Sequence, residues 1–575
     1  MSRSLALSVF LISCLFLLLG YLHTSTAFDQ DLGRHLLTGK IITYSLHVPT
    51  TNLFSYTYPV FPFINHHWLS EVVFYNLTTV TGTTGLFLLS LLLIVATWGL
   101  VARDALRKAH PLIFLVLSVI YLRILFERTD IRPELFSFLF LATVVTILYR
   151  YKEKFTKLIF LLIPLELLWT NMHIYFPIGI LITLLFVIDN LVTHRKNLLN
   201  PQTKTLIAVL FLMGLTTLLN PHGISGATYP LRVFQNYGYT IEENQNPFFL
   251  LSLGFTKPSL LYVELAVGIV LIAFLARFKK TRLIDWLLFI TFTAIAFNAV
   301  RNFPLFVFAT FIPAVRSLSE LLLTSLKNFS PQKRLIIIRL AYFLVLIFIV
   351  WQGRSVIALH GLGIGFAESA KSALTFFEKE KLHGPIFNNF DIGSYIEYRL
   401  YPREKVFIDG RPEAYPASFI QDTYIKMQTD PALFAKVSKK HNFNTIVFSH
   451  TDQTPWAEAF LRSIVHDPDW ITVYLDPMMI ILVRNVPDNQ KVIKAFGKQL
   501  QNYSFPLPGD EKSLRTLGHF YGEIGLTKQL EEILLRLVGL EANNCNTLTV
   551  LAQIYSQENN PAAGLYSQRA QAVCR

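Results

Sequence analysis

Two aspartates near the start of the chain are the side chains best suited to chemistry. Asp29 and Asp31 stand two residues apart at the head of the first extended polar loop, residues 28–82. Such a pair can converge on one Mg²⁺ or Mn²⁺ ion, or one carboxylate can act as the general base for a hydroxyl. Either aspartate is also suited to cap a helix that begins at Leu32. We predict that Asp29 and Asp31 are catalytic, and that Asp31 is the candidate metal ligand.

The same loop closes with a second polar cluster. His66 and His67 precede Trp68, and Glu71 follows His67 by four residues, so His67 and Glu71 share one face of a helix. Three nearby ligands, without a cysteine or a second histidine at helical spacing, argue against a zinc site. Contact of His66, His67 and Glu71 with a substrate or a lipid phosphate fits better. The alternative is an amphipathic helix at the membrane surface, with Trp68 in the headgroup layer.

Further polar side chains recur in short loops that alternate with apolar segments. A guanidinium matches phosphate oxygens bidentately and stays charged, so arginines in these loops suit a leaving phosphate. The alternative for these arginines is an ion pair with Glu127, Asp130 or Glu134. Ionisable groups at membrane depth are costly and are usually paired or functional. The candidate ligands for substrate or phosphate in these loops are Arg128, Arg132, Glu134, His173, His222 and Arg301.

Long apolar segments must position these loops. Of the 575 residues, 52% are hydrophobic and only 15% are charged, whereas soluble proteins carry about 25% charged residues. The mean hydropathy is +0.43. Apolar runs of about 17–25 residues can cross a bilayer as helices. We predict an α-helical polytopic membrane protein with about 11 transmembrane helices, at residues 5–22, 83–101, 111–126, 135–149, 158–170, 174–192, 205–219, 259–276, 284–300, 303–322 and 335–352.

The formal net charge of +13 is a topology signal. Lys and Arg cluster in every second loop, for example at 103–108, 150–157 and 277–282. This alternation follows the positive-inside rule, and it argues against nucleic-acid binding. It predicts that the N-terminus is cytoplasmic, and that loop 28–82 and the C-terminal part of the chain are extracytoplasmic.

Residues 1–27 present two alternatives. A basic start, an apolar run and Ser25-Thr-Ala27 suit a cleaved signal peptide, but the run exceeds the roughly 7–15 residues of a signal-peptide core. A retained membrane anchor is therefore favoured. Cys545 and Cys574 lie in the predicted outer part, where oxidising conditions permit a disulfide. The sequence leaves their pairing open.

The composition changes after the transmembrane part, residues 1–352, to that of a soluble domain, residues 353–505. Short β-rich runs alternate there with helical patterns, which predicts a small extracytoplasmic α/β domain. Asp391 and Asp409 stand near glycines, and each either binds substrate or belongs to a turn, where Asp and Gly are favoured for backbone reasons. The expected helix is 367–381, and the expected strands are 405–408, 445–448 and 480–483.

Residues 511–575 are predicted to form a tetratricopeptide-like helical tail. Three positions recur after 34 residues: Leu517, Tyr521 and Gly525 correspond to Leu551, Tyr555 and Asn559. Thirty-four residues is the tetratricopeptide period, although about three repeats are needed for a stable stack. The tail is either a docking site for a protein partner or a structural lid on the α/β domain.

Several signatures of the chain resemble the GT-C superfamily of polytopic membrane glycosyltransferases. The shared features are the acidic pair after the first span, the number of spans and the outer C-terminal domain. The resemblance is to a poorly characterised bacterial branch related to protein mannosyltransferases and aminoarabinose transferases, and it covers about residues 10–415. The signatures that carry it are Asp29-x-Asp-Leu-x-x-His-Leu-x-Thr-Gly39, Pro49-x-x-Asn-x-Phe-Ser-Tyr56, His67-Trp-Leu-x-Glu71, Arg132-Pro-Glu134 and Phe390-Asp-x-Gly-x-Tyr395.

The resemblance implies a function. In that superfamily the donor is generally a polyprenyl-phosphate sugar and transfer inverts the anomeric centre. Asp29 would activate the acceptor, which is a lipid, a glycan or a protein, and Asp31 would be the second acidic position. The oligosaccharyltransferase Trp-Trp-Asp signature and the mannosyltransferase Asp-Glu pair are absent, so transfer to asparagine is not implied and the role of Asp31 stays open. The implied location is the plasma (inner) membrane of a bacterium.

Two rival functions remain at this point. A transporter of a lipid-linked glycan or a small molecule would carry ionisable residues at mid-span and internal repeats. Here Arg123 and Glu166 lie near the outer ends of predicted spans, and the sequence shows no duplicated halves. A non-catalytic membrane scaffold would depend on the tail and would tolerate loss of the Asp29 carboxylate.

Overall fold

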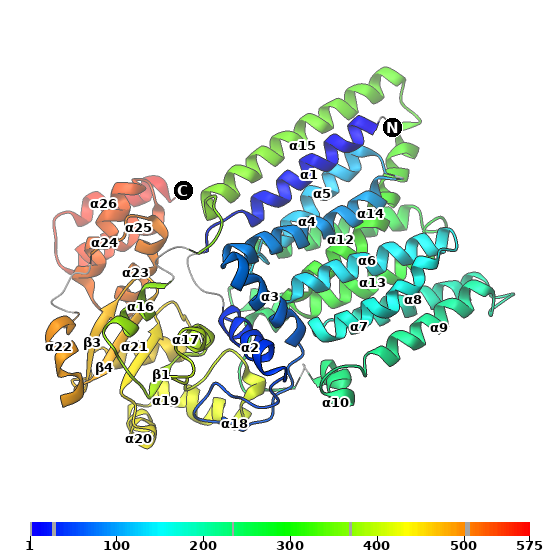
Figure 1. Ribbon diagram of the computed structural model, residues 1–575. Helices are drawn as coiled ribbons and strands as arrows, with labels where there is room; N and C mark the ends of the chain where they lie inside the picture. Colours follow the sequence, from blue (N-terminus) through cyan, green and yellow to red (C-terminus); the bar gives the residue numbers. More distant parts are fainter. Residues whose placement is uncertain are drawn as a thin grey trace.

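The chain folds into a bundle of apolar helices and a unit built around a β-sheet, which meet at one end of the bundle (Figure 1). We call this second part, residues 371–498, the sheet unit. The computed structural model describes residues 3–25, 30–107, 109–232, 235–366, 371–498, 500 and 506–574. Two helical hairpins at the C-terminus pack against the sheet unit, on the side away from most of the bundle.

Each predicted apolar segment contains a helix, because a bilayer-length apolar run can satisfy its backbone polar groups only internally. Six helices are long and apolar enough to cross a membrane, and three shorter ones are also apolar. The protein is therefore a multi-pass membrane protein, and the count of about eleven spans stays a prediction. The helices are α1 (Arg3–Tyr21), α4 (Thr84–Leu106), α5 (Pro111–Leu125), α6 (Glu134–Glu153), α7 (Leu162–Met172), α8 (Pro177–Thr193), α9 (Pro201–Thr216), α12 (Pro258–Ala276), α13 (Leu283–Asn298), α14 (Phe303–Leu326) and α15 (Pro331–His360).

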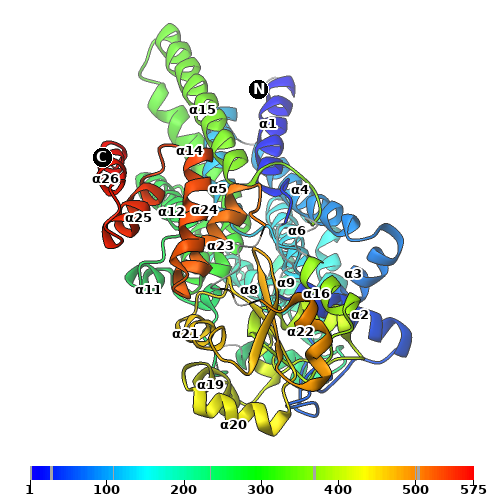
Figure 2. The same cartoon turned by 90° about the vertical axis from the view of Figure 1, so that its left-hand side faces the viewer.

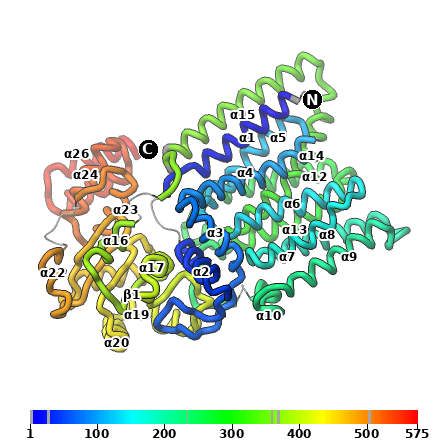
Figure 3. Tube along the Cα trace, in the orientation of Figure 1, coloured from blue at the N-terminus to red at the C-terminus, as the bar shows by residue number. Residues whose placement is uncertain are grey.

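The last helix of the bundle, α15, returns along α1 (Figure 3). Its outward face is almost entirely apolar and exposed, for example at Ile336, Leu340, Phe343 and Val350. A face of this kind suits contact with lipid. The helix also carries the chain from the bundle back to the sheet unit.

The sheet is mixed, with strand order β1-β2-β4-β3. Only β1 and β2 are parallel, and the other pairs are antiparallel. Side chains of a strand alternate between two faces, and both faces are covered. Val447 and Ile481 pack toward α16 (Ser372–Lys379) and α17 (Gly393–Leu400). Phe448 and Ile480 pack toward α20 (Pro431–His441) and α21 (Pro455–Ile464). The strands are β1 (Ile386–Asn388), β2 (Thr445–Ser449), β3 (Trp470–Leu475) and β4 (Met479–Arg484).

Two of the three predicted strands are confirmed, as β2 and β4, and the third is wrong. Residues 405–408 form no strand; Val406 makes a single bridge to Ser55 of loop 28–82. The predicted helix 367–381 forms as α16, and residues 367–370 lie outside the described residues. The other helices of the outer part are α10 (Gly223–Thr228), α11 (Pro247–Ser252), α16 (Ser372–Lys379), α17 (Gly393–Leu400), α18 (Ala417–Phe419), α19 (Lys426–Thr429), α20 (Pro431–His441), α21 (Pro455–Ile464) and α22 (Gln490–Phe496).

Loop 28–82 contains two helices, α2 (Leu32–Ser45) and α3 (Trp68–Thr81). Two glycines let α2 approach its neighbours: a Cβ on Gly39 would collide with the carbonyl of Glu71 in α3, and a Cβ on Gly33 with the carbonyl of Ser394 in α17. Helix α2 therefore packs between α3 and α17, and through these contacts it links loop 28–82 to the sheet unit.

The C-terminal tail consists of two helix pairs, α23 (Glu511–Glu523) with α24 (Thr527–Leu540) and α25 (Cys545–Gln557) with α26 (Ala563–Val573). Figure 2 shows α23 and α24 beside the strands. Gly525 and Asn559, the positions 34 residues apart, both end a helix with positive φ, of 75° and 54°. A disulfide joins Cys545 to Cys574, which settles the open pairing. Assignment of the tail to the tetratricopeptide class stays a prediction.

Candidate active site

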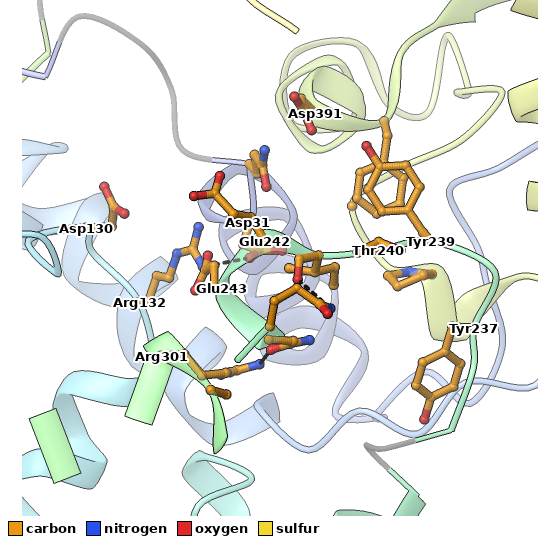
Figure 4. A pocket seen from close by; sticks show the side chains of 18 of the residues that line it. Asp31, Asp130, Arg132, Tyr237, Tyr239, Thr240, Glu242, Glu243, Arg301 and Asp391 are labelled. Atoms are coloured by element: carbon orange, nitrogen blue, oxygen red, sulfur yellow. Dashed lines mark hydrogen bonds and ion pairs between the residues drawn. The ribbon is translucent and has the colours of Figure 1, made fainter. Parts of the chain in front are cut away.

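A cavity of about 1550 Å³ lies where the helical bundle, α2 and the sheet unit meet (Figure 4). Its wall includes five of the predicted site residues, namely Asp31, His66, His67, Arg132 and Arg301. The predicted residues Glu71, Arg128, Glu134, His173 and His222 are not among the described residues that line it. Asp29 lies outside the described residues.

The Asp31 carboxylate faces arginines. Asp31 directly precedes α2, but it makes no side-chain cap hydrogen bond. Instead Oδ1 lies 2.8 Å from Arg34 Nη2, and Oδ2 lies 3.7 Å from Arg132 Nη1. Burial acts to raise the pKa of Asp31, but Arg34 and then Arg132 outweigh it and hold this pKa well below its ordinary value. The carboxylate is therefore ionised at neutral pH.

Arg132 also pairs with Glu243, in the short 3₁₀ turn Glu242–Asn244. Its Nη1 lies 2.7 Å from Glu243 Oε1, and Arg128 pairs with the other oxygen of the same carboxylate. Burial acts to raise the pKa of Glu243, but Arg132 and Arg128 lower it to about 2. Arg128 further pairs with Glu134 at 2.6 Å. For Arg128 the ion-pair alternative is therefore the correct one, because both Glu134 and Glu243 pair with its guanidinium group.

Arg301 differs from Arg128, because among the described residues it has no carboxylate within ion-pair distance. Its Nε donates to the Tyr175 hydroxyl at 2.9 Å and its Nη1 donates to Asn244 Oδ1 at 2.8 Å. The guanidinium carbon lies 5.5 Å from the centre of the Tyr175 ring. Arg301 is therefore a fixed cation on the cavity wall that neutral partners hold.

The histidines of the loop form a neutral cluster. The rings of His66 and His67 lie 4.0 Å apart, and the His67 ring lies 5.2 Å from both His35 and His173. Burial lowers the pKa of His66 to about 3 and takes the pKa of His67 well below its usual value. Neutral imidazoles are weak partners for a phosphate, but they can exchange hydrogen bonds with sugar hydroxyls.

Three predicted ligands lie behind the cavity wall. The Glu71 carboxylate is fully buried and accepts from His35 at 2.9 Å and Asn65 at 2.6 Å. His222 accepts from the backbone N–H of Asn65 at 3.2 Å. His173 shares a hydrogen bond with Ser137 at 2.9 Å. The Glu71 and His222 contacts position loop 28–82, and the His173 contact joins the segment after α7 to α6.

The sheet unit supplies the wall opposite the bundle. Ser394 donates a hydrogen bond to the carbonyl of Gln30, so the Phe390–Tyr395 signature contacts the residue between the two aspartates. Gly410 lies against the same place: a Cβ there would be 3.4 Å from the Gln30 carbonyl and 3.6 Å from Asp31 Oδ1. The segments around Ser394 and Gly410 thus both lie against residues 30–31.

Asp409 has a structural environment. It is buried and pairs with Arg411 at 2.7 Å. Arg411 donates to Asn52 at 2.7 Å, and its guanidinium carbon lies 5.2 Å from the Phe54 ring and 4.8 Å from the Phe63 ring. For Asp409 the turn alternative therefore fits better than substrate binding. Asp409 holds Arg411, and Arg411 fixes loop 28–82 on the sheet unit. Asp391, in contrast, lines the cavity.

Sequence reasoning did not select several cavity residues. Glu243, Tyr239 and Asp452 line the cavity together with Asp31 and Asp391. None of Glu243, Asp452 and Tyr239 belongs to a local signature in the sequence. Their convergence is a property of the tertiary fold.

A divalent cation was predicted at Asp31, and the described residues do not assemble a site for it. A metal of this kind needs several oxygen ligands at one point. Among the described residues, the only group of three or more such ligands that converges is Glu458, His519 and Glu523, in α21 and α23. The Asp31 carboxylate faces guanidinium groups instead. We therefore derive no step through a metal.

Comparisons with known proteins agree with this architecture. No protein-family model and no characterised protein sequence matches the chain. Among solved structures, the oligosaccharyltransferase AglB of Archaeoglobus fulgidus, in complex with an inhibitory peptide and a dolichol-phosphate, matches with a TM-score of 0.56 and 12% identity. The match covers 82% of this chain and 73% of that chain. The chain shares the fold of this oligosaccharyltransferase.

Two further structures of the Archaeoglobus fulgidus oligosaccharyltransferase support the same fold. One is tethered to an acceptor peptide and matches with a TM-score of 0.55 and 13% identity over 85% of this chain and 75% of that chain. The other is a complex with Zn and sulfate, with a TM-score of 0.54 and 12% identity over 96% of this chain and 85% of that chain. At such identities the likeness establishes the fold alone.

Proposed function

We propose that the protein is an integral membrane glycosyltransferase of GT-C type. It moves a sugar from a polyprenyl-phosphate donor to an extracytoplasmic acceptor. The fold supports this proposal, because a solved enzyme that shares it was captured with dolichol-phosphate, itself a polyprenyl phosphate. The single observation that carries it is the cavity, in which an ionised Asp31 and the guanidinium groups of Arg132 and Arg301 share one wall.

The arginines suit the phosphate end of the donor. Arg301 is held by Tyr175 and Asn244, both neutral, and among the described residues it forms no direct ion pair, although the Glu243 and Glu134 carboxylates act on it from further away. A phosphate ester at this wall would supply such an ion pair. Arg132 lies on the same wall, although Glu243 and Asp31 share its charge. Arg301 is therefore the principal phosphate ligand in this proposal.

The aspartates suit the acceptor end. In the proposed step, the hydroxyl oxygen of the acceptor forms a bond to the anomeric carbon while the bond from that carbon to the phosphate oxygen breaks. Asp29 takes the hydroxyl proton as general base. The polyprenyl phosphate leaves with the electron pair, and Arg301 and Arg132 stabilise its charge. Asp31, kept ionised by Arg34 and Arg132, orients the acceptor hydroxyl.

The membrane topology follows from the same proposal. We place the active site, the α/β domain of residues 353–505 and the tail of residues 511–575 outside the cytoplasm, at a bacterial plasma membrane. The Cys545–Cys574 bond supports this placement, because disulfides persist in oxidising compartments. The exposed hairpins of the tail suit a protein partner.

The test is transfer from a panel of radiolabelled polyprenyl-phosphate sugars by the purified full-length protein. Arg301→Gln should lower transfer by about 100-fold or more, since loss of one charged stabiliser of a developing oxyanion costs roughly that factor. The matched control is Arg277→Gln, because Arg277 pairs with Glu320 and does not line the cavity. Equal activity of the Arg301 and Arg277 variants would contradict the proposed role of Arg301.

A further inference from the structure

The cavity has a second wall with different chemistry, built by the sheet unit and residue Tyr239. The rings of Tyr239 and Phe390 stack with centroids 4.1 Å apart and an interplanar angle of 15°. The Trp456 ring meets Tyr239 edge-on at 6.0 Å. Figure 4 shows Asp391 and Tyr239 on the side of the cavity opposite Arg132. This wall, which we call the aromatic wall, comprises Tyr239, Phe390, Asp391, Asp452 and Trp456.

Two carboxyl groups belong to the aromatic wall. Asp452 is held in place, because it accepts hydrogen bonds from the Thr454 backbone and hydroxyl at 3.1 Å and 2.8 Å and from the Asn389 amide at 3.1 Å. Asp391 has no hydrogen-bond or ion-pair partner in the described part of the chain. Burial, and next the nearby Asp452, raise the pKa of Asp391 to about 7. At neutral pH the pair therefore offers acceptor oxygens together with a carboxyl proton that can be donated.

The indole of Trp456 provides an independent observation. Its Nε1 is shielded from solvent, and in the described residues it has no hydrogen-bond partner. A buried donor without a partner is costly, and such groups in native structures require an explanation. Because Nε1 is shielded from the open cavity as well, the part of Trp456 that lines the cavity is the apolar surface of its ring.

Neutral polar groups complete this end of the cavity. Ser449, Thr451, Gln453 and Thr454 lie near Asp452 in the sequence and line the same space. Hydroxyl and amide groups both donate and accept hydrogen bonds. The wall thus combines aromatic faces with a mixed set of donors and acceptors, whereas the Arg132–Arg301 wall is cationic.

We propose that the aromatic wall is an acceptor subsite that binds a neutral sugar ring, so that the acceptor is a glycan. A sugar ring has an apolar C–H face that packs on an aromatic surface, and it has hydroxyls that both donate and accept. These two properties match the half-buried rings of Tyr239 and Trp456, behind which the buried Phe390 stacks on Tyr239, and the two carboxyl groups. The proposal rests on the proposed glycosyltransferase function, in which the phosphate end of the donor occupies the opposite wall.

A ligand with an ammonium group is the competing occupant. Aromatic rings and carboxylates also attract cations. A site for an ammonium group would gain most from two ionised carboxylates, whereas here Asp391, with a pKa of about 7, is only about half ionised at neutral pH. The two ligand classes predict opposite results for removal of the Asp391 charge.

The test is binding of defined probes to the full-length protein in nanodiscs, measured by saturation-transfer NMR and titration. The probes are a neutral hexose trisaccharide, a neutral pentose trisaccharide, a glucosamine trisaccharide with free amines, and an Asn-X-Thr peptide. Asp391→Ala should weaken binding of a neutral trisaccharide about tenfold or more, and Asp391→Asn, which keeps the hydrogen bonds, should weaken it less than about threefold. Asp422→Asn, an exposed carboxylate paired with Lys426 in the same domain, is the control and should bind normally.

The outcomes separate this proposal from the proposed function. Binding of only the amine probe, with equal losses in the Asn and Ala variants, would overturn the sugar subsite, and so would preferred binding of the peptide. Absence of binding by folded wild type to every neutral probe would also overturn it. Hydrolysis of the donor in the absence of any acceptor is measured in parallel, and it reports on the proposed function alone. The Asp422→Asn control, which lies outside the cavity, should keep that hydrolysis.

Discussion

Replacement of Arg411 by leucine should loosen loop 28–82 from the sheet unit. Arg411 is buried, with 3% of its side chain exposed, and it pairs with the fully buried Asp409 at 2.7 Å. It also binds Asn52 and lies between Phe54 and Phe63. The Arg411→Leu variant would leave the Asp409 carboxylate buried without its cation, while the loop would lose its anchor.

The expected cost is large because the pair is buried. Removal of one partner of a buried ion pair costs about 3–5 kcal/mol. A second carboxyl group, Glu397, adjoins Asp409, and burial followed by this neighbouring charge raises the pKa of Glu397 well above its ordinary value. Without Arg411 the closest remaining partner of Asp409 outside the carboxyl pair would be the neutral Tyr415 hydroxyl, which donates to it at 2.8 Å. The local opening equilibrium should therefore rise by about 150- to 5000-fold, since 1.4 kcal/mol corresponds to a factor of ten.

Hydrogen–deuterium exchange of the full-length protein measures this opening in peptides that cover residues 405–416 and 50–64. The control is Lys426→Leu, because Lys426 and Asp422 form an ion pair of the same 2.7 Å length with 61% of each side chain exposed. Exposed pairs contribute about 0–1 kcal/mol, so protection should fall less than about fivefold. Equal loss of protection in the two variants would refute the argument that burial makes the Asp409–Arg411 pair an anchor.

Three further perturbations have defined outcomes. The pKa of Asp391 is about 7 in the folded protein, against 3.8 for the ordinary group. Because folded Asp391 holds its proton where the unfolded chain has lost it, the free energy of unfolding should fall as pH rises from about 4 to about 7. Thermal unfolding of the Asp391→Asn variant should lack this slope. Gly33→Ala should lower the melting temperature, because its Cβ would meet the α17 backbone, whereas Gly99→Ala, with one atom at 4.0 Å, should not. Reduction of the Cys545–Cys574 bond, which closes a separation of 29 residues, should destabilise the tail by about 3–4 kcal/mol in chemical unfolding; an unchanged midpoint would contradict that.

The sequence predicts well what depends on local patterns. Apolar runs such as 259–276 and 303–322 form helices because length and composition alone determine them. Strands β2 and β4 were recognisable because both lie at the centre of the sheet and contain continuous apolar runs, 446–448 and 479–483. Strand β3, whose residues are partly exposed, gave a weaker signal.

What the sequence could not supply depends on distant partners. Residues 405–408 have the composition of a strand, but Val406 pairs with Ser55 instead of a sheet neighbour. In the cavity, Arg132 meets Glu243 across 111 residues. The separation of the predicted ligands into cavity-lining residues and buried supports, such as Glu71, likewise follows from how α2 packs between α3 and α17. No spacing rule encodes these contacts.

The most direct test of the central claim is release of polyprenyl phosphate from a polyprenyl-phosphate sugar, followed by ³¹P NMR in nanodiscs. The account predicts that the wild-type protein converts the phosphodiester signal to a phosphomonoester for at least one sugar of the panel. Asp29→Asn should bind the same donor and leave its signal unchanged. Equal conversion by the Asp29 variant, or donor binding without conversion by the wild type when a neutral glycan acceptor is supplied, would contradict it.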